Sequence, residues 1–578
     1  MVETSENHLN FNELPMHQKR QFVPETADLT SLKEIKALFE QLIAENIESS
    51  EELERWVLNR SELEAALDQQ GSILYILMTC QTDDAARVQS YKDFIEKIVP
   101  ATKMFEDRLN KKYLKESELF GLKEGRYGIY TRAICNDIEL FVEKNVELQT
   151  KIDLLSQEYQ GICGALMVEF EGCQRTMQEM EKFLLEPDRD LRERAWRASS
   201  QRRLSESSKL DKLFDQMLVL RDEIGQNAGF ENFRDYKFKS LYRFDYDPKD
   251  CRQYHASIER LVVPLWTQIL KKRKEQMNLK QLRPWDTAVD PLGRAPLKPF
   301  TDVKDLVTGC GEIFHRVDQD LGARFSEMAD RGLLDLVSRK GKAPGGYQST
   351  LNEARKPFIF MNAVGIDGDV RTLLHEGGHA FHSLACAHDP LLDYRHGPME
   401  FNEVASMGME LLSDQYLSVF YEKEDEGRSR VKHLEDIVFT LLWVAVIDAF
   451  QHWIYENPKH SADDRREVWL NLHRRFSGGV VDWTGLDEEH GFLWHRQLHI
   501  FEVPFYYIEY GIAQLGALQL WLNGKSDWGK TLSQYREGLS LGGSRPLPEL
   551  FEAAGLRFDF SEKMIAPLIE EVRKELNR

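Results

Sequence analysis

Two histidines four residues apart, in the segment HEGGHAFH, constrain this chain more than any other feature of its sequence. They are His375 and His379, and Glu376 follows the first of them directly. Residues four apart lie on one face of an α-helix, so both imidazoles can hold one metal ion if the segment is helical. A chance match to this short motif in a chain of 578 residues is expected on the order of a few times in a hundred. The motif therefore predicts a helix with a metal site and needs support from its surroundings.

Helical spacing of apolar residues dominates the first half of the chain. We expect residues 29–282 to be nearly all helix, because few Pro or Gly residues interrupt this spacing. In LLEPDRDLRERAWRA a new helix begins near Pro187, with Asp188 or Asp190 as its cap. The predicted domains are an N-terminal helical domain, 1–187, and a metal-binding domain, 188–578, whose lobes can interleave. An example of the helical spacing of apolar residues in the first half of the chain is the set Leu210, Leu213, Phe214, Met217 and Leu220.

Irregular segments come before the histidine motif. Prolines in RPWDTAVDPLGRAPLKPF predict a loop, since each one removes a backbone donor and fixes φ. After Gly345 and Gly346, the β-branched and aromatic residues of YQSTLNEARKPFIFMN predict a short hairpin, the only sheet we expect. Asp367 or Asp369 then caps the helix that carries the motif. The fold class is mostly α, with a small hairpin or sheet beside the metal-binding helix.

A catalytic zinc ion needs a third protein ligand besides two imidazoles, and it keeps one position open for water. Within the helical segment MEFNEVASMGMELLSDQYL, Glu403 and Glu410 lie seven apart and share a face, which suits a ligand and an acid that orients a ligand. His382 is not expected as a fourth ligand, because four protein ligands would leave no position for water. The downstream acids that can supply the third ligand are Asp389, Asp393, Glu400, Glu403, Glu410 and Asp414.

Composition excludes several classes of protein. Lys and Arg number 75 against 96 Asp and Glu, and the formal charge of -21 repels nucleic acid and anionic membrane surfaces. The seven cysteines include no C-x-x-C pair, which argues against a disulfide framework or a thiolate zinc site. No basic start followed by an apolar stretch is present, so we expect a cytoplasmic protein. The apolar run 437–447 is too short to cross a bilayer and predicts a buried core helix.

The motif and its surroundings resemble a known family. HEGGHAFH followed by Glu403 within FNEVASMGME is similar to the thimet oligopeptidase and oligoendopeptidase F family of zinc peptidases. The resemblance extends over roughly residues 190–578, through GFENFRDYKF, GGYQST, PFIFMN and HIFEVPFYYIEYGIAQLGA. It implies that His375, His379 and Glu403 bind one Zn²⁺ per chain. GPMEF, at 397–401, is similar to an aminopeptidase motif that precedes the histidine helix, whereas here it follows the helix.

The resemblance also implies roles near the scissile carbonyl. The family's His and Tyr residues there correspond to His499, Tyr507 and Tyr510, and Tyr506 competes with Tyr507 because spacing after the histidine varies within the family. Glu376 is the expected base that takes a proton from water. The implied fold is a two-lobed, zincin-type helical shell around a deep channel that admits short unstructured peptides.

We therefore expect a zinc-dependent oligoendopeptidase that hydrolyses internal bonds of short peptides. Two alternatives remain, a zinc aminopeptidase and a catalytically silent peptide-binding protein. Manganese or cobalt can also bind a His, His, Glu set. The partners expected are peptides, without nucleic acid or membrane, and the sequence does not give the oligomeric state.

Overall fold

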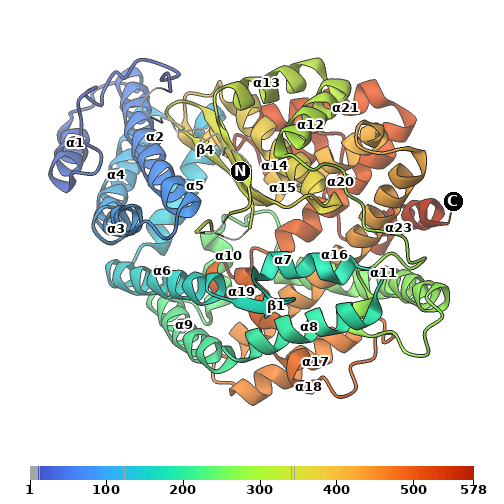
Figure 1. Ribbon diagram of the computed structural model, residues 1–578. Coiled ribbons are helices and arrows are strands. Elements are labelled where there is room, and N and C mark those ends of the chain that lie inside the picture. The colour runs from blue at the N-terminus through green and yellow to red at the C-terminus, as the bar shows by residue number, and fades with distance from the viewer. Residues whose placement is uncertain (1–10, 12–13, 123, 340, 344, 578) are drawn as a thin grey trace. The chain divides into compact units, whose positions relative to one another are not determined.

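The computed structural model describes Phe11 and residues 14–122, 124–339, 341–343 and 345–577. Contacts divide the chain into two compact units, each built from three separate segments. Unit 1 comprises 1–150, 300–419 and 523–558, and unit 2 comprises 151–299, 420–522 and 559–578. The chain is mostly helical, as expected (Figure 1).

Unit 1 contains the histidine motif and a three-stranded sheet. Its strands are β3 (Leu334–Val337), β4 (Tyr347–Leu351) and β5 (Lys356–Ala363). Its helices are α1 (Leu32–Ala44), α2 (Ser50–Cys80), α3 (Ala85–Asp93), α4 (Val99–Phe120), α5 (Gly128–Leu140), α12 (Val303–Val317), α13 (Gln319–Asp330), α14 (Asp367–Cys386), α15 (Met399–Ser413), α21 (Trp528–Ser540) and α22 (Leu547–Ala553).

Unit 2 is mostly helical, and its strands among the described residues are β1 (Met167–Phe170) and β2 (Cys173–Thr176), which form one hairpin. Two helices cross the division between the units, α6 (Glu143–Gly164) and α20 (Ile508–Ser526). The remaining helices are α7 (Met177–Glu181), α8 (Arg189–Leu204), α9 (Ser207–Asn227), α10 (Phe233–Ser240), α11 (Pro248–Gln276), α16 (Lys423–Glu456), α17 (Ala462–Phe476), α18 (Asp487–Gly491), α19 (Leu498–Glu502) and α23 (Glu562–Leu576).

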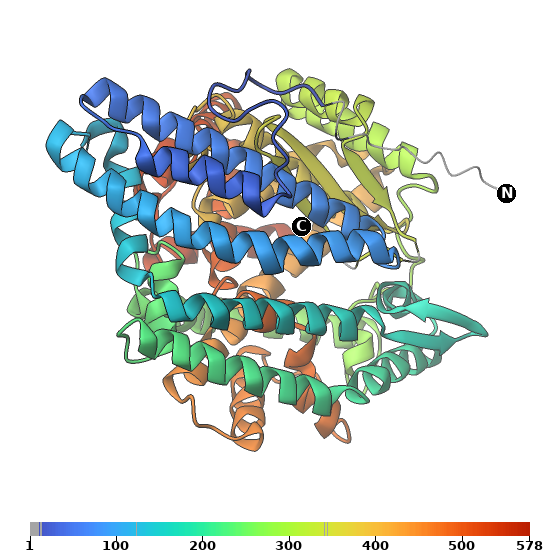
Figure 2. The same ribbon diagram turned by 90° about the vertical axis from the view of Figure 1, so that its left-hand side faces the viewer.

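The N-terminal helices share a hydrophobic core with residues far along the chain. Leu391 and Tyr394 are buried in the same cluster as the apolar faces of α1, α2, α4 and α5. The Tyr394 hydroxyl donates to the carbonyl of Arg126 at 2.5 Å and accepts from the Tyr130 amide at 3.2 Å. Figure 2 shows the blue helices of this segment running alongside one another. This division into units does not test the expected boundary at residue 187, which stays a prediction.

The hairpin predicted before the histidine helix is present. β4 and β5 pair antiparallel with Tyr347 opposite Phe360 and Leu351 opposite Lys356. A third strand extends this hairpin into a small sheet, because β3 pairs parallel with β5 and the sheet order is β3-β5-β4. β3 has only four residues, and a strand so short shows little alternation in its sequence.

The expectation of a single sheet is wrong, because β1 and β2 form a separate antiparallel hairpin in the first half of the chain (Figure 2). Its two turn residues, Glu171 and Gly172, both have positive φ, at 50° and 72°. Two successive positive φ angles are typical of the type I′ turn that closes two-residue hairpins. The dipeptide Glu-Gly is a weaker signal than Asn-Gly for this turn, which is why the sequence alone predicted helix here.

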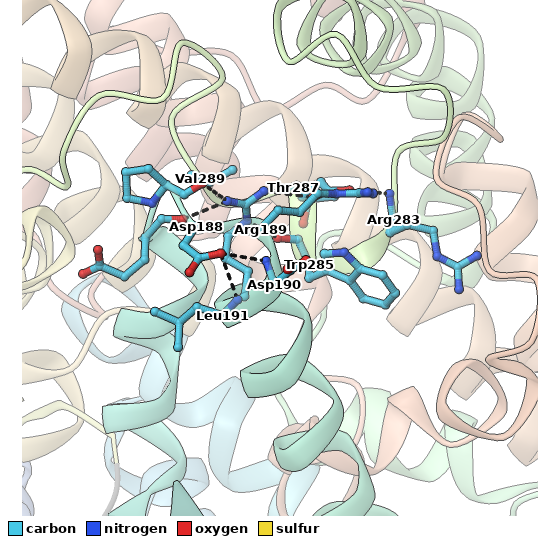
Figure 3. Close-up of polar contacts among 12 residues, drawn as sticks. Asp188, Arg189, Asp190, Leu191, Arg283, Trp285, Thr287 and Val289 are labelled. Atoms are coloured by element: carbon cyan, nitrogen blue, oxygen red, sulfur yellow. Dashed lines mark hydrogen bonds and ion pairs between the residues drawn. The ribbon is translucent and has the colours of Figure 1, made fainter. Parts of the chain in front are cut away.

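The helix predicted after Pro187 begins as expected. Asp188 is the N-cap of α8, and its carboxylate accepts from the backbone amides of Asp190 and Leu191 at 3.0 and 3.3 Å (Figure 3). Arg189, in the first turn, pairs with the fully buried carboxylate of Asp286 at 2.8 Å. The start of α8 is thus fixed to the loop that the prolines predicted.

The apolar run 437–447 lies in α16, whose length and composition would suffice to cross a membrane. However, 78% of its most apolar window is buried inside the protein. Val438, Leu441 and Val444 have no exposed surface. α16 is therefore a core helix of unit 2, as predicted.

Candidate metal centre

The helix that carries the histidine motif, α14, has a fixed start. Asp369 accepts hydrogen bonds from the backbone amides of Val364, Gly365 and Ile366, at 2.7 to 2.9 Å. Asp369 lies inside the first turn and Ile366 precedes the helix, so neither of the expected aspartates is the N-cap itself. The carboxylate nevertheless satisfies three amide donors and stabilises this helix end.

The two glycines of the histidine motif allow close packing on two sides of α14, and Gly378 is the one that faces α15. A Cβ on Gly378 would come within 2.5 Å of the Ala405 carbonyl oxygen and 2.6 Å of the Ser406 Cα. The Tyr535 hydroxyl, from α21, donates to the same Ala405 carbonyl at 2.7 Å. Gly377 faces the ring of Phe314 on α12. Gly378 thus lets the acid-bearing helix α15 lie close to the histidines, and Gly377 lets α12 pack on α14.

This close approach brings Glu403 to both histidines. Its Oε2 lies 3.4 Å from His375 Nε2 and 3.5 Å from His379 Nε2. The possible ligand atoms of all three residues lie within 4.8 Å of one another. Glu403 is 2% exposed, whereas the two histidines retain partly exposed side chains. The three donors therefore converge on one point that solvent can approach from the histidine side.

Two further contacts orient these donors. Glu410 Oε1 lies 2.7 Å from His375 Nδ1 and leaves Nε2 of the same ring directed at Glu403. The Ser406 hydroxyl can donate a hydrogen bond to Glu403 Oε2 or to the Glu403 carbonyl oxygen, each 3.0 Å away. Sequence reasoning selected Glu410 but missed Ser406. Its position, three residues after Glu403 on a helix, is the signal that would have identified it.

Glu376 lies next to the three donors on the buried side of α14. It is 6% exposed, and its Oε2 has no hydrogen-bond partner among the described residues. Burial raises the pKa of this carboxyl above its ordinary value, although the neighbouring imidazoles oppose the shift. An unpaired buried carboxylate oxygen is costly in a fold, so its presence here indicates a function rather than a structural role.

The charges around the site favour a cation. Burial opposes ionisation of Glu403, but His379 and His375 hold the pKa of its carboxyl well below the usual range. For His375, burial alone would lower the pKa, and the hydrogen bonds to Glu403 and Glu410 outweigh that effect and raise it. Two carboxylates around two imidazoles thus create a place where a positive charge is stabilised.

The other acids considered as ligands are placed elsewhere. Asp414 accepts from Arg371 at 2.7 Å, and Asp389 accepts from Arg126 at 2.7 Å. Glu400 is buried and Asp393 is exposed, and neither belongs to the group of converging donors. His382 is also outside that group. It is buried against Phe401, and burial lowers its pKa to about 3.

The residues expected near the scissile carbonyl form a cluster in unit 2. His499 Nε2 lies 3.3 Å from the Tyr510 hydroxyl, and its ring centre lies 4.9 Å from that of Tyr507. The ring of Tyr506 is also near, at 5.7 Å, so the structure leaves Tyr506 and Tyr507 as competitors. Burial raises the pKa of Tyr507, which keeps its hydroxyl protonated and able to donate. Gln497 contacts His499 Nδ1 at 2.7 Å.

The donor set fits a zinc ion. Ligand atoms about 2.0 to 2.1 Å from a tetrahedral ion are themselves about 3.3 Å apart. The separations of 3.4 and 3.5 Å between Glu403 and the two imidazoles match this spacing closely. Two neutral imidazoles and one carboxylate are also a known ligand combination of catalytic zinc.

Comparison with known proteins decides the family. The model of "Peptidase family M3" matches residues 183–568, and that of "Peptidase M3 N-terminal domain" matches residues 22–141. The chain belongs to peptidase family M3. Because this is a metallopeptidase family, membership implies a bound metal ion.

Individual relatives agree with this assignment. Oligopeptidase PepF of Bacillus subtilis is 25% identical over 309 residues, covering 51% of this chain and 44% of the relative. The oligoendopeptidase F homolog of Borreliella burgdorferi is 24% identical over 309 residues, covering 50% and 49%. The alignments thus span about half the length of these curated relatives.

A solved structure matches over almost the whole chain. PZ peptidase A, determined with an inhibitor, is 28% identical and superposes with a TM-score of 0.91. The match covers 96% of this chain and 99% of that one. Both the family and the helical, zincin-type fold class predicted from the sequence are therefore confirmed. The deep channel that the resemblance implies stays a prediction.

Proposed function

We propose that this chain is a zinc-dependent oligoendopeptidase that hydrolyses internal bonds of short, unstructured peptides. The observation that carries the proposal is the convergence of His375, His379 and Glu403 beside the unpaired carboxylate of Glu376. Membership of peptidase family M3 and the names of the relatives, oligopeptidase and oligoendopeptidase, support the substrate class. Cytoplasmic residence and one catalytic zinc per chain belong to the same proposal.

A zinc ion bound by these residues would polarise the scissile carbonyl and lower the pKa of a water molecule to about 7. Glu376 then acts as the base that takes the proton from the attacking water. Its free oxygen can later pass this proton to the leaving amine, which needs it to depart. Glu410 holds the His375 ring in position through Nδ1, so Nε2 keeps its lone pair for the metal.

His499, Tyr507 and Tyr510 are proposed to stabilise negative charge as it forms on the former carbonyl oxygen. Their mutual contacts support a common role, because His499 Nε2 can donate to the Tyr510 oxygen and leave the Tyr510 hydroxyl hydrogen for the carbonyl oxygen. The substrate backbone is proposed to pair with β4, an edge strand that has β5 as its partner and lies against α14. The Thr350 and Ser383 hydroxyls, 2.9 Å apart, join this strand to α14. Main-chain pairing would give affinity with modest sequence selectivity.

The test is cleavage of an end-blocked, internally quenched peptide library by the wild type and by Glu376→Gln, with zinc measured in both. We expect Glu376→Gln to retain zinc and to lose at least about a thousandfold in kcat/KM. Fragments from the wild type would define the bonds that are cleaved. Wild-type protein that holds zinc but leaves blocked peptides intact would overturn the proposal, and cleavage of only unblocked peptides would identify an aminopeptidase.

A matched pair of variants on α15 tests the third ligand. Glu403→Gln should lose zinc, because it removes a charged donor at 3.4 and 3.5 Å from the imidazoles. Glu400→Gln changes another buried acid of the same helix and should retain zinc. The reverse result would reassign the ligand to Glu400.

A further inference from the structure

A second group of metal-binding residue types lies in unit 2, within its helical core. Cys251 and His255 lie one turn apart on α11, and Asp448 and His452 lie one turn apart on α16. All four are buried, with exposed fractions of 1, 6, 0 and 5% in that order. The two helices pack against each other, so two pairs spaced four apart share one interior face.

Three of these residues converge like ligands. A ligand atom from each of Cys251, Asp448 and His452 lies within 4.8 Å of the other two. His452 Nε2 lies 3.3 Å from Asp448 Oδ2, which is close to the distance between two ligand atoms of a tetrahedral zinc ion. His255 Nε2 lies 2.8 Å from the same oxygen and can fix the carboxylate by donating to it.

The polar atoms of this group are not satisfied by the protein. Among the described residues, His452 Nδ1 and Asp448 Oδ1 have no hydrogen-bond partner, and His452 Nε2 meets Asp448 Oδ2 at 3.3 Å without hydrogen-bond geometry. Buried polar atoms are almost always bonded, so two unpaired atoms beside this contact call for an additional partner. The rings of Phe238 and Phe505 pack on His452 with centres 5.8 and 5.3 Å away, which makes the surroundings apolar.

We propose that Cys251, Asp448 and His452 bind a second divalent transition metal ion, of the zinc type, with a structural role. A thiolate and an imidazole select zinc over magnesium or calcium, which prefer oxygen donors. On binding, the Cys251 thiol releases its proton to solvent and the sulfur bonds to the metal. The two positive charges of the ion then balance one thiolate and one carboxylate, which leaves the buried site neutral.

The site differs from the catalytic one in two ways. It contains sulfur, whereas His375, His379 and Glu403 supply only nitrogen and oxygen. It is also buried, so a substrate has no access. It would tie α11 to α16 and thereby join two segments of unit 2 that are far apart in sequence. His255 is a positioning residue in this site, because it acts on the metal through Asp448.

The test uses zinc content and cobalt spectroscopy of the full chain. Wild-type protein purified without chelators should carry two zinc ions, and the cobalt form should show a thiolate-to-cobalt charge-transfer band in the near ultraviolet. Because the catalytic donors include no sulfur, such a band reports on Cys251. The double variant His375→Ala/His379→Ala should keep one zinc and the band.

The matched cysteine variants are Cys251→Ser and Cys310→Ser. Cys310 is also fully buried, but it lies in α12 and belongs to neither group of converging donors. Cys251→Ser should lose the band and one zinc, and Cys310→Ser should lose neither. Wild-type protein with at most one zinc and no thiolate band would overturn the proposal, even if the Cys251 variant does not fold.

Discussion

At the scale of single residues, the hydroxyl of Ser406 fixes the carboxylate that completes the donor set. It is fully buried and lies 3.0 Å from Glu403 Oε2. Loss of a contact that orients a ligand typically weakens metal binding by about 10- to 100-fold. We expect this loss in Ser406→Ala, measured as the zinc affinity in competition with a chelator.

Ser413→Ala is the control for this variant. Ser413 lies on the same helix, is also fully buried, and its hydroxyl has no hydrogen-bond partner among the described residues. Its removal should leave zinc affinity unchanged. Equal affinities of the two variants would show that the Ser406 hydroxyl does not orient Glu403.

A buried pair of histidines in unit 2 should make stability depend on pH. His490 Nε2 lies 2.9 Å from His473 Nδ1, and Trp483 stacks on His490. Burial lowers the pKa of His473 to about 3 and that of His490 to about 4, with Arg474 and Arg496 adding to the effect and Asp487 opposing it. Both rings are therefore neutral in the folded protein at ordinary pH.

The sign of the effect follows from the unfolded value of about 6.5. When folding lowers the pKa of a histidine, the folded protein has its full stability above about pH 6.5. It loses stability as the pH falls from there toward about 4, because the unfolded chain then binds protons that the folded protein does not. Between about pH 7 and 5, the thermal midpoint of His490→Gln should fall less than that of the wild type. Above about pH 7.5 the difference between the two midpoints should be constant, and a parallel fall at lower pH would refute the role of the pair.

How much of the site the sequence could predict depends on the kind of interaction. His375, Glu376 and His379 are set by spacing along one helix, so a single segment is enough to predict their proximity. Ser406 follows Glu403 by three residues on one helix, so it too lay within reach of the sequence, whereas the Ala405 carbonyl meets Gly378 and Tyr535 only when α14 and α21 pack on α15. Such contacts depend on tertiary structure, and one sequence without its fold does not contain them.

At the scale of secondary-structure elements, the distance between α14 and α15 depends on Gly378. A methyl group there would meet backbone atoms of Ala405 and Ser406 at 2.5 and 2.6 Å, so one helix would have to move. We expect Gly378→Ala to destabilise unit 1 by about 1 to 3 kcal/mol and to weaken zinc binding. The measurements are the unfolding midpoint and the metal content after dialysis.

Gly311→Ala provides the control for this prediction. Gly311 also lies inside a helix of unit 1, but its added Cβ would make an ordinary contact of 3.6 Å with the Phe325 ring. Alanine there should be neutral or slightly stabilising because it improves helix propensity. If Gly378→Ala behaves like Gly311→Ala, the helices do not need glycine to approach each other.

Helix starts and hairpins could be predicted where local residue types give a strong signal, and they were missed where that signal is weak. The cap at Asp188 and the β4–β5 hairpin follow from local residue types, and both are present. The turn at Glu171 and Gly172 was missed, because glutamate rarely adopts positive φ and gives no turn signal. β3 was missed because four residues carry too little pattern.

At the scale of the whole molecule, the interleaving of the units exceeds what sequence patterns can predict. Unit 1 combines residues 1–150 with 300–419 and 523–558. The contacts responsible, such as Tyr394 against Arg126 and Tyr130, join residues more than 250 positions apart. Composition and periodicity describe segments, so they do not tell which segments share a core.

The net charge of -21 is a property of the whole chain, and it should affect which peptides associate fastest. A negative field attracts cationic substrates, and salt screens this attraction, with a Debye length of about 10 Å at 0.1 M. We expect kcat/KM for a lysine-flanked, end-blocked peptide to fall severalfold between about 20 and 500 mM salt. The value for a glutamate-flanked peptide with the same core should stay constant or rise, because its repulsion is screened.

This comparison separates long-range attraction from contacts within the site. Long-range attraction changes association, so kcat for both peptides should be nearly independent of salt, while kcat/KM falls only for the lysine-flanked peptide. A specific basic or acidic subsite would instead leave a preference for one peptide at high salt, where the long-range field is screened. Equal salt dependence of kcat/KM for the two peptides would show that the charge of the chain does not steer substrates. The residual preference at high salt would then measure what the residues around the metal centre contribute to specificity on their own.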